Sequence, residues 1–238
     1  MTGGGGRVAL VTGATGALGR AVAAAFAQDG WRLGLVGTDE DRLRALAGDL
    51  GLDDERWTPA VGDLVQRDAA RAAVARVEER FGQVDAVIHL VGGWAGGTPV
   101  TELDPDELAT MLDQHLWTTL HVVQAAAPGM VARDWGRILA VATPFASDPG
   151  ATSGGYAVAK AGQEVVLRML AKEVAGTGVT VNVVVVKAID AKHERETAPS
   201  ARNAAWTTPE EIVAAFRFLA SDEAAAVNGA RLPLHGRG

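Results

Sequence analysis

The chain has 238 residues, of which 48% are hydrophobic and 21% charged, and its net charge is −7. These values are ordinary for a globular protein, and the negative charge leaves no basic face for a nucleic acid partner. Zero cysteines exclude disulfides, thiolate catalysis and cysteine-ligated metals, and we expect no metal site.

No apolar run approaches the roughly 20 residues that a membrane helix needs. Residues 1–6 lack the charged and apolar regions of a signal peptide. We therefore expect a cytoplasmic protein, with no membrane partner, that folds as one domain over residues 1–238 and has a frayed N-terminus.

A glycine-rich turn joins the first expected strand, at residues 7–12, to the first expected helix, which ends near residue 28. Gly13, Gly16 and Gly19 follow a Gly-x-x-Gly-x-x-Gly spacing. Between a strand and a helix, such a turn lets a dinucleotide pyrophosphate lie against backbone N–H groups and the helix dipole. The alternative is a tight turn that binds no ligand.

The second expected strand, residues 31–36, ends at Gly37-Thr38. At this point an acid would bind the ribose hydroxyls of NAD, whereas a base would face the 2′-phosphate of NADP. The absence of an acid at Gly37 favours NADP, with Thr38 and Arg42 facing the phosphate. Asp39 also lies near, but it could equally be the N-cap of the helix that carries Arg42.

The third and fourth expected strands, residues 57–61 and 84–91, each end in a segment that could contact a ligand. Asp63 follows the third strand and is also a candidate N-cap for the next helix. After the fourth strand, four glycines surround Trp94, so the backbone can approach a ligand while the indole offers a flat apolar wall. The alternative for Trp94 is packing in the core or at a subunit contact.

A phenol and an ammonium, Tyr156 and Lys160, stand four residues apart on an expected helix and project from the same face. The tyrosine pKa of about 10 makes it a poor proton donor or acceptor, but a fixed cation nearby lowers that pKa. Upstream, Thr143 ends the apolar run 136–142, which predicts a buried strand with a hydroxyl at its carboxyl end. The four-residue spacing of Tyr156 and Lys160 also arises by chance in amphipathic helices.

Together, the glycine turn, Thr143 and the Tyr156/Lys160 pair resemble the short-chain dehydrogenase/reductase family, nearly from end to end. The resemblance implies an α/β, Rossmann-type doubly wound parallel sheet of about seven strands, in the order 3-2-1-4-5-6-7, with helices on both faces. It also implies an NAD(P)-dependent enzyme in which Tyr156 is the general acid, Lys160 lowers its pKa and holds the nicotinamide ribose, and Thr143 orients the substrate. Asp63 would bind the adenine amino group. The implied cofactor-binding residues are Gly13, Thr15, Gly16, Leu18, Gly19, Thr38, Asp63, Leu64, Tyr156, Lys160 and Ile189.

The glycine loop around Trp94 is similar to that of dihydropteridine reductase, a divergent family member that reduces a flat, nitrogen-rich ring. This similarity implies reduction of a carbonyl or an imine/quinonoid bond in a small cyclic substrate. We expect the ring to lie against Trp94, under a mobile flap over residues 192–207 that carries Trp206.

The site departs from the family pattern in four places. His89-Leu90 and Ala191 replace the family's usual asparagines and threonine. Val186-Lys187 replaces the family's usual Pro-Gly, and Lys187 either binds a carboxylate or points to solvent. His115 stands where the family has an asparagine that anchors a water in a proton relay, so it either joins a relay or is a buried structural histidine. These departures support an alternative function in the same pocket, namely dehydration, cyclisation, isomerisation or ligand sensing without hydride transfer.

The helices expected within residues 104–133 and 155–175 carry more apolar side chains than one sheet face can cover. A second apolar face remains to be buried. We therefore expect a symmetric homodimer or homotetramer. The expected binding partner of the pocket is a small-molecule substrate.

Overall fold

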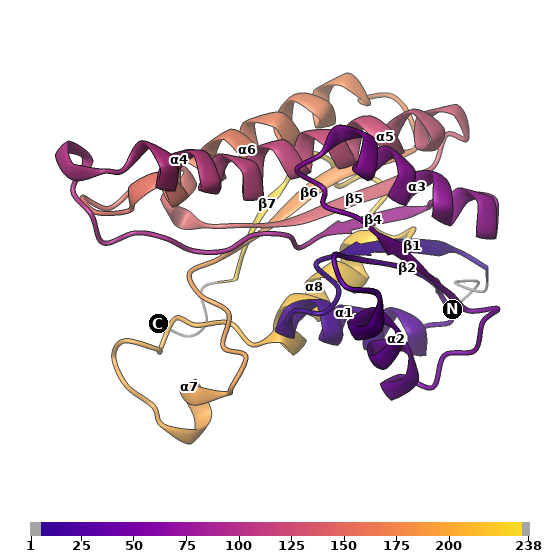
Figure 1. The fold of residues 1–238 in the computed structure, drawn as a ribbon, viewed down its shortest axis with the longest axis horizontal. Helices are drawn as coiled ribbons and strands as arrows, with labels where there is room; N and C mark the ends of the chain where they lie inside the picture. Colours follow the sequence, from indigo (N-terminus) through magenta and orange to yellow (C-terminus); the bar gives the residue numbers. More distant parts are fainter. Residues whose placement is uncertain (1–5, 235–238) are drawn as a thin grey trace.

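A single parallel sheet organises the protein. The computed structural model describes residues 6–234, so most of the N-terminal segment that we expected to fray lies outside the described residues. The sheet has seven strands in the order β3-β2-β1-β4-β5-β6-β7, and every neighbouring pair is parallel (Figure 1). The predicted strand order is confirmed. The strands are β1 (Val8–Thr12), β2 (Arg32–Gly37), β3 (Trp57–Val61), β4 (Ala86–His89), β5 (Gly136–Ala142), β6 (Val179–Val186) and β7 (Arg231–Leu234).

Helices cover both faces of this sheet. One layer holds α3, α4, α5 and α6, and the opposite layer holds α1, α2 and α8 (Figure 1). The α-helices are α1 (Ala17–Gln28), α2 (Glu40–Asp49), α3 (Arg67–Phe81), α4 (Pro105–Leu112), α5 (Thr118–Ala132), α6 (Gly154–Glu173), α7 (Glu194–Thr197) and α8 (Pro209–Ala220). Two 3-10 turns, η1 (Val100–Glu102) and η3 (Pro144–Ala146), and a π-helix, η2 (Asp113–Trp117), complete the set.

The central strands are apolar throughout because both of their faces are covered. In β6, all eight residues are buried. Val183 and Val185 pack under the layer of α5 and α6, whereas Val184 and Val186 pack under the layer of α1 and α8. This alternation follows from the two-residue period of a strand.

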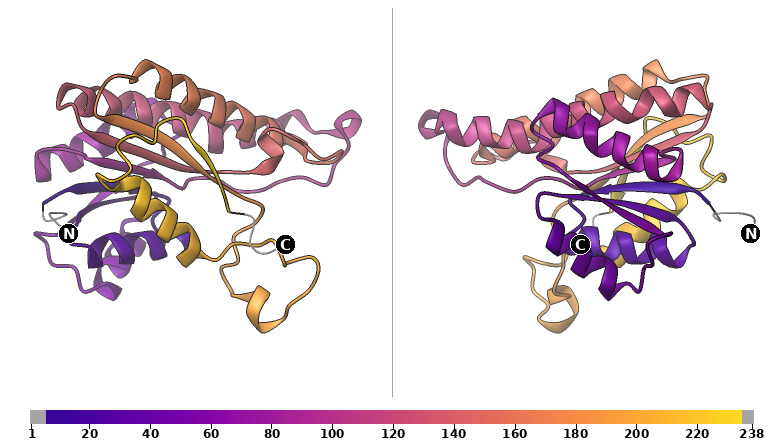
Figure 2. Two further views of the ribbon diagram at one scale, coloured as in Figure 1. Left: turned by 180° about the vertical axis from the view of Figure 1, so that it is seen from behind. Right: turned by 45° about the vertical axis from the view of Figure 1, so that its right-hand side comes forward.

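The strand order reverses direction beside β1, which pairs with β2 on one side and β4 on the other. In an open parallel sheet, ligands bind at such a switch point, outside the carboxyl ends of the strands. The segment that carries α7 also extends from this edge, away from both helical layers (Figure 2). Within residues 6–234, none of the helices combines the length and the hydrophobicity that crossing a bilayer requires.

Candidate active site

The glycine turn after β1 leaves the N-terminus of α1 open to a ligand. Gly13 has φ +63°, and a Cβ there would lie 2.9 Å from the Leu90 carbonyl oxygen. A Cβ at Gly19 would lie 2.3 Å from the Gly13 carbonyl oxygen, so packing within the protein requires both glycines. At Gly16, the nearest atom to an added Cβ is 3.4 Å away, and no side chain caps the helix N-terminus. The first N–H groups of α1 are therefore available for an anion, as the pyrophosphate of a dinucleotide requires.

Two adjoining pockets, of about 330 and 610 Å³, follow the carboxyl edge of the sheet and share Gly13, Gly16 and Gly92 in their walls. Every residue of the cofactor-binding set that the family resemblance implies lines one or both of them, but Arg42, which we expected to face the 2′-phosphate, lines neither. The smaller pocket is lined by Gly13, Thr15, Gly16, Thr38, Asp63 and Leu64, and the larger by Gly13, Gly16, Leu18, Gly19, Tyr156, Lys160 and Ile189.

The two acids near the smaller pocket hold backbone N–H groups. Asp39 accepts a hydrogen bond from the N–H of Arg42 at 3.1 Å and is the N-cap of α2. Arg42 is exposed and does not line the pocket, unlike Thr38. Asp63 accepts from the N–H of Val65 at 3.1 Å, whereas the N-cap of α3 is Gln66, so Asp63 closes a turn rather than capping that helix.

Tyr156 lines the larger pocket from the first turns of α6. Burial raises the pKa of its phenol, and the nearby Thr143 hydroxyl lowers it by less. Our expectation that Lys160 lowers the pKa of Tyr156 is wrong for this structure. The reason is that desolvation of the phenol dominates, while the ammonium is directed elsewhere.

Lys160 is buried one turn along α6 and donates to the Val141 carbonyl oxygen and to Oε1 of Gln163, both at 2.9 Å. Burial lowers the pKa of Lys160 to about 8, and the charge of Glu164 opposes this shift. Gln163 in turn donates to the Thr119 hydroxyl at 2.8 Å. The sequence analysis missed Gln163, although its place three residues after Lys160 on one helix face was the signal that could have identified it.

Thr143 follows the last residue of β5, as expected, and its hydroxyl is buried. It makes no hydrogen bond of ordinary length within residues 6–234, although it is near enough to the Tyr156 phenol to affect its pKa. A buried hydroxyl without a partner is unfavourable, and a substrate oxygen or nitrogen beside Tyr156 would supply that partner.

His115 lies in the π-helix η2 and packs its ring edge-on against Tyr156, with 5.4 Å between ring centroids. Its Nε2 is 2.9 Å from the Gly93 carbonyl oxygen, so this nitrogen donates, and the buried Nδ1 has no partner among the described residues. Burial and the charge of Lys160 lower the pKa of His115 to about 3. The imidazole is therefore neutral at pH 7 and holds the loop before Trp94 through Gly93. This supports a structural role for His115 over a proton relay that would use its imidazolium form.

His89, at the end of β4, bridges β1 and α5. Its Nδ1 is 2.9 Å from the Thr12 hydroxyl on β1, and its Nε2 is 3.2 Å from the Thr118 hydroxyl on α5. Desolvation, with smaller effects of Lys160 and His115, lowers the pKa of His89 to about 3. An imidazole thus links β1, β4 and α5.

Trp94 and Trp206 differ in their relation to the larger pocket. Trp94 lines it and is 68% exposed, which excludes core packing for this indole. Trp206 does not line it, and its carbonyl oxygen accepts a hydrogen bond from Arg195, so the expected cover over the substrate is not formed by this residue. Arg202 from the same segment lines the pocket instead, and no pattern in the sequence indicated this.

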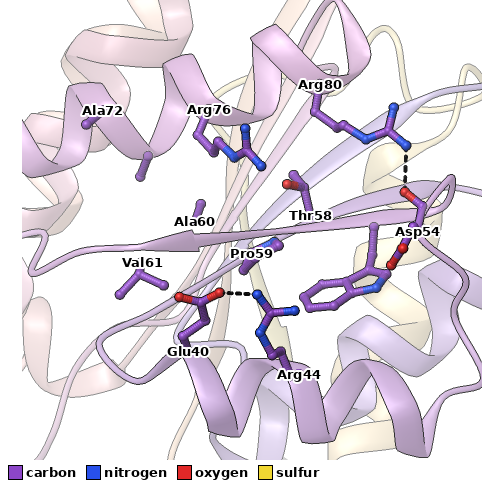
Figure 3. Close-up of a pocket in the computed structure, with 12 residues that line it drawn as sticks. Glu40, Arg44, Asp54, Thr58, Pro59, Ala60, Val61, Ala72, Arg76 and Arg80 are labelled. Carbon is purple, nitrogen blue, oxygen red and sulfur yellow. Dashed lines mark hydrogen bonds and ion pairs between the residues drawn. The ribbon is translucent and has the colours of Figure 1, made fainter.

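A separate groove of about 500 Å³ runs along the outer edge of β3, between α2 and α3 (Figure 3). Arg76 and Arg80 reach it from α3, while Arg44 pairs with Glu40 on α2. The groove shares no lining residue with the two pockets at the carboxyl edge, and it contains none of the predicted site residues.

The strand order, the glycine turn and the group of Thr143, Tyr156 and Lys160 at the carboxyl edge define a Rossmann-type oxidoreductase fold. The sequence pattern of the short chain dehydrogenases matches residues 7–201. The chain therefore belongs to the short-chain dehydrogenase/reductase family, whose members use NAD or NADP.

Named relatives of full length support this assignment. The chain is 33% identical to the (2S)-((R)-hydroxy(phenyl)methyl)succinyl-CoA dehydrogenase subunit BbsC of Thauera aromatica, covering 95% of this chain and 92% of the relative. It is 30% identical to the 3-oxoacyl-acyl-carrier-protein reductase FabG of Pseudomonas aeruginosa, covering 97% and 96%. A solved structure of a short chain dehydrogenase from Bacillus anthracis superposes with a TM-score of 0.86 at 25% identity, covering 97% and 95%. The resemblance of the Trp94 loop to dihydropteridine reductase remains a prediction.

Proposed function

We propose that this protein uses NADPH, or less readily NADH, to reduce a carbonyl or an imine/quinonoid bond of a small cyclic substrate. The observation that carries this proposal is the placement of the Tyr156 phenol at the larger pocket beside the buried Thr143 hydroxyl, which makes no hydrogen bond of ordinary length among the described residues. A phenol is protonated at neutral pH, which is the form that a general acid needs.

In this proposal, some residues of the pocket bind the substrate or the cofactor, and Tyr156 transfers the proton. Thr143 would donate a hydrogen bond to the substrate oxygen or nitrogen, and Tyr156 would give that atom its proton. Lys160, already held by Val141 and Gln163, would hold the nicotinamide ribose. When bound, the reduced nicotinamide supplies the hydride.

The open N-terminus of α1 and the glycine turn fit the pyrophosphate, and Asp63 lines the pocket where the adenine would lie. The preference for NADP rests on the absence of an acid at Gly37 and on Thr38, which lines this pocket. Arg42 gives the preference no support, because it does not line the pocket.

The cyclic substrate is proposed from Trp94 and its glycines. The exposed indole at the larger pocket can stack on a flat ring, and Gly92 permits close packing because a Cβ there would lie 2.2 Å from Cε1 of His115. The relatives named as dehydrogenases and reductases support hydride transfer and do not favour the alternative of a non-redox reaction.

Assembly into a homodimer or homotetramer is proposed from an apolar groove of about 740 Å³ between α5 and α6. Val131 and Met169 line it and are largely exposed. Such a face on two neighbouring helices is typical of a subunit contact.

The test is oxidation of NADPH and NADH, followed at 340 nm, with a panel of cyclic ketones, quinones and cyclic imines. We expect turnover with at least one class. Tight cofactor binding without turnover on the whole panel would favour the non-redox alternative, and failure to bind either cofactor would refute the proposal.

A further inference from the structure

The charged residues that line the larger pocket are all cations. They are Lys160, Lys187 and Arg202, and no aspartate or glutamate lines this pocket. The chain as a whole carries a net charge of −7, so this local excess opposes the overall balance. The β3 groove differs, because its arginines are accompanied by Glu40 and Asp54 (Figure 3).

Two of these three cations have no partner among the described residues. Lys160 is held by two acceptors at 2.9 Å. In contrast, the side chains of Lys187 and Arg202 make no hydrogen bond or ion pair with any residue in the range 6–234. Lys187 leaves β6 directly, whereas Arg202 comes from the segment after α7, so two separate parts of the chain bring unpaired cations to one pocket.

Two acids that lie near this pocket in the sequence, Asp190 and Glu210, are already engaged. Asp190 is buried and accepts the N–H groups of Glu194 at 2.7 Å and Arg195 at 2.9 Å, which fixes the start of α7. Glu210 lies 3.0 Å from His193. These carboxylates therefore stabilise the segment around α7 and are not available to neutralise the pocket.

We propose that Lys187 and Arg202 bind an anionic group of the substrate, so that the substrate is a flat ring compound carrying a carboxylate. This inference rests on the proposed function, because it places the reducible bond at Tyr156 and the ring against Trp94. A charged hydrogen bond is about twice as strong as a neutral one, so the pocket discriminates a carboxylate from an uncharged ester of nearly the same shape. The two cations are thus determinants of specificity.

The experiment compares 2-, 3- and 4-acetylbenzoate, in which the carboxylate lies at increasing distance from the ketone, with their methyl esters. For at least one isomer, we expect kcat/KM with NADPH to be about tenfold or more higher for the acid than for the ester, which corresponds to about 1.4 kcal/mol. In Lys187→Met and Arg202→Met, this ratio should fall by about tenfold or more. Lys172→Met is the matched control, because it removes the same charge from an exposed position on α6 that does not line the pocket, and its ratio should match that of the parent protein.

A ratio near one for all three isomers, or a ratio that both variants leave unchanged, would overturn the inference. Calorimetry of NADPH binding separates the cofactor from the substrate. If the variants lose NADPH affinity while the acid-to-ester ratio of kcat/KM stays unchanged, the cations bind the cofactor phosphates, and the inference is overturned. If none of these compounds turns over, the panel of cyclic ketones, quinones and cyclic imines still decides the proposed function, and calorimetry of each acid and ester in the presence of NADP decides the inference. Preferential binding of an acid, lost in Lys187→Met, supports the anion site, and equal or absent binding refutes it.

Discussion

Replacing His89 by asparagine should change how the stability of the protein depends on pH. His89 is buried and bridges Thr12 and Thr118, and burial lowers its pKa from 6.5 to about 3. Because the folded-state pKa lies below the unfolded-state value, the unfolded chain binds the proton first as the pH falls. Stability from this residue is therefore complete above pH 6.5 and is lost progressively down to about pH 3.

The magnitude follows from the shift. Each pH unit within this window removes on the order of 1 kcal/mol of unfolding free energy, so two units, from pH 6.5 to 4.5, remove about 2–3 kcal/mol. At pH 7.5, the His89→Asn protein should be less stable than the parent by about 1–3 kcal/mol, because a bridge between two hydroxyls is weakened.

The assay is urea unfolding of both proteins at several pH values between 4.5 and 7.5. The stability difference at pH 7.5 serves as the internal reference. By pH 4.5, the parent should lose about 2–3 kcal/mol more than the variant, so the two curves should converge or cross. Parallel curves over this range would show that His89 is not held neutral, and the account of the β1-β4 link would then be wrong.

Three further changes test the site and the assembly. Trp94→Ala should raise KM for a flat substrate by roughly 2- to 12-fold, because a stacking contact is lost. The Tm should change little, since the indole is 68% exposed. A much lower Tm with an unchanged KM would contradict the stacking role. Gly37→Asp should shift the kcat/KM ratio toward NADH, and the atom nearest to the added Cβ belongs to the flexible Leu43 side chain, at 3.3 Å. A parent enzyme that already prefers NADH tenfold would refute the NADP preference. Met169→Glu should yield monomers in light scattering, whereas the exposed Val61→Glu at the β3 groove should not; a parent that is monomeric at micromolar concentration would refute the oligomer.

The positions of the strands and the outline of the site could be predicted because those features depend on local patterns, whereas the strand order came from the family resemblance. Apolar runs such as 179–186 indicate strands that are buried on both faces, and the positions of Gly13 and Gly19 are set by close backbone contacts that no other residue tolerates. Tyr156 and Lys160 share a helix, so their relative placement follows from their spacing.

The features that the sequence did not predict depend on contacts between distant segments. The pKa of Tyr156 rises because tertiary packing buries the phenol, and the direction of the Lys160 ammonium depends on Val141 and Gln163 rather than on helix spacing. Likewise, the path of residues 190–207 decides that Arg202, and not Trp206, lines the larger pocket. No local pattern determines that path.

The measurement that tests the central claim most directly is a single-turnover assay of NADPH oxidation with the Tyr156→Phe protein and a substrate found in the panel. Removing the phenol hydroxyl should lower the rate of hydride transfer by roughly 10²–10⁴, the contribution expected of a general acid. Cofactor affinity, measured by calorimetry, should stay nearly unchanged, since the phenol holds little of the nucleotide. A Phe variant that transfers hydride at nearly the parent rate would show that Tyr156 is not the acid, and the mechanism proposed for this pocket would fail.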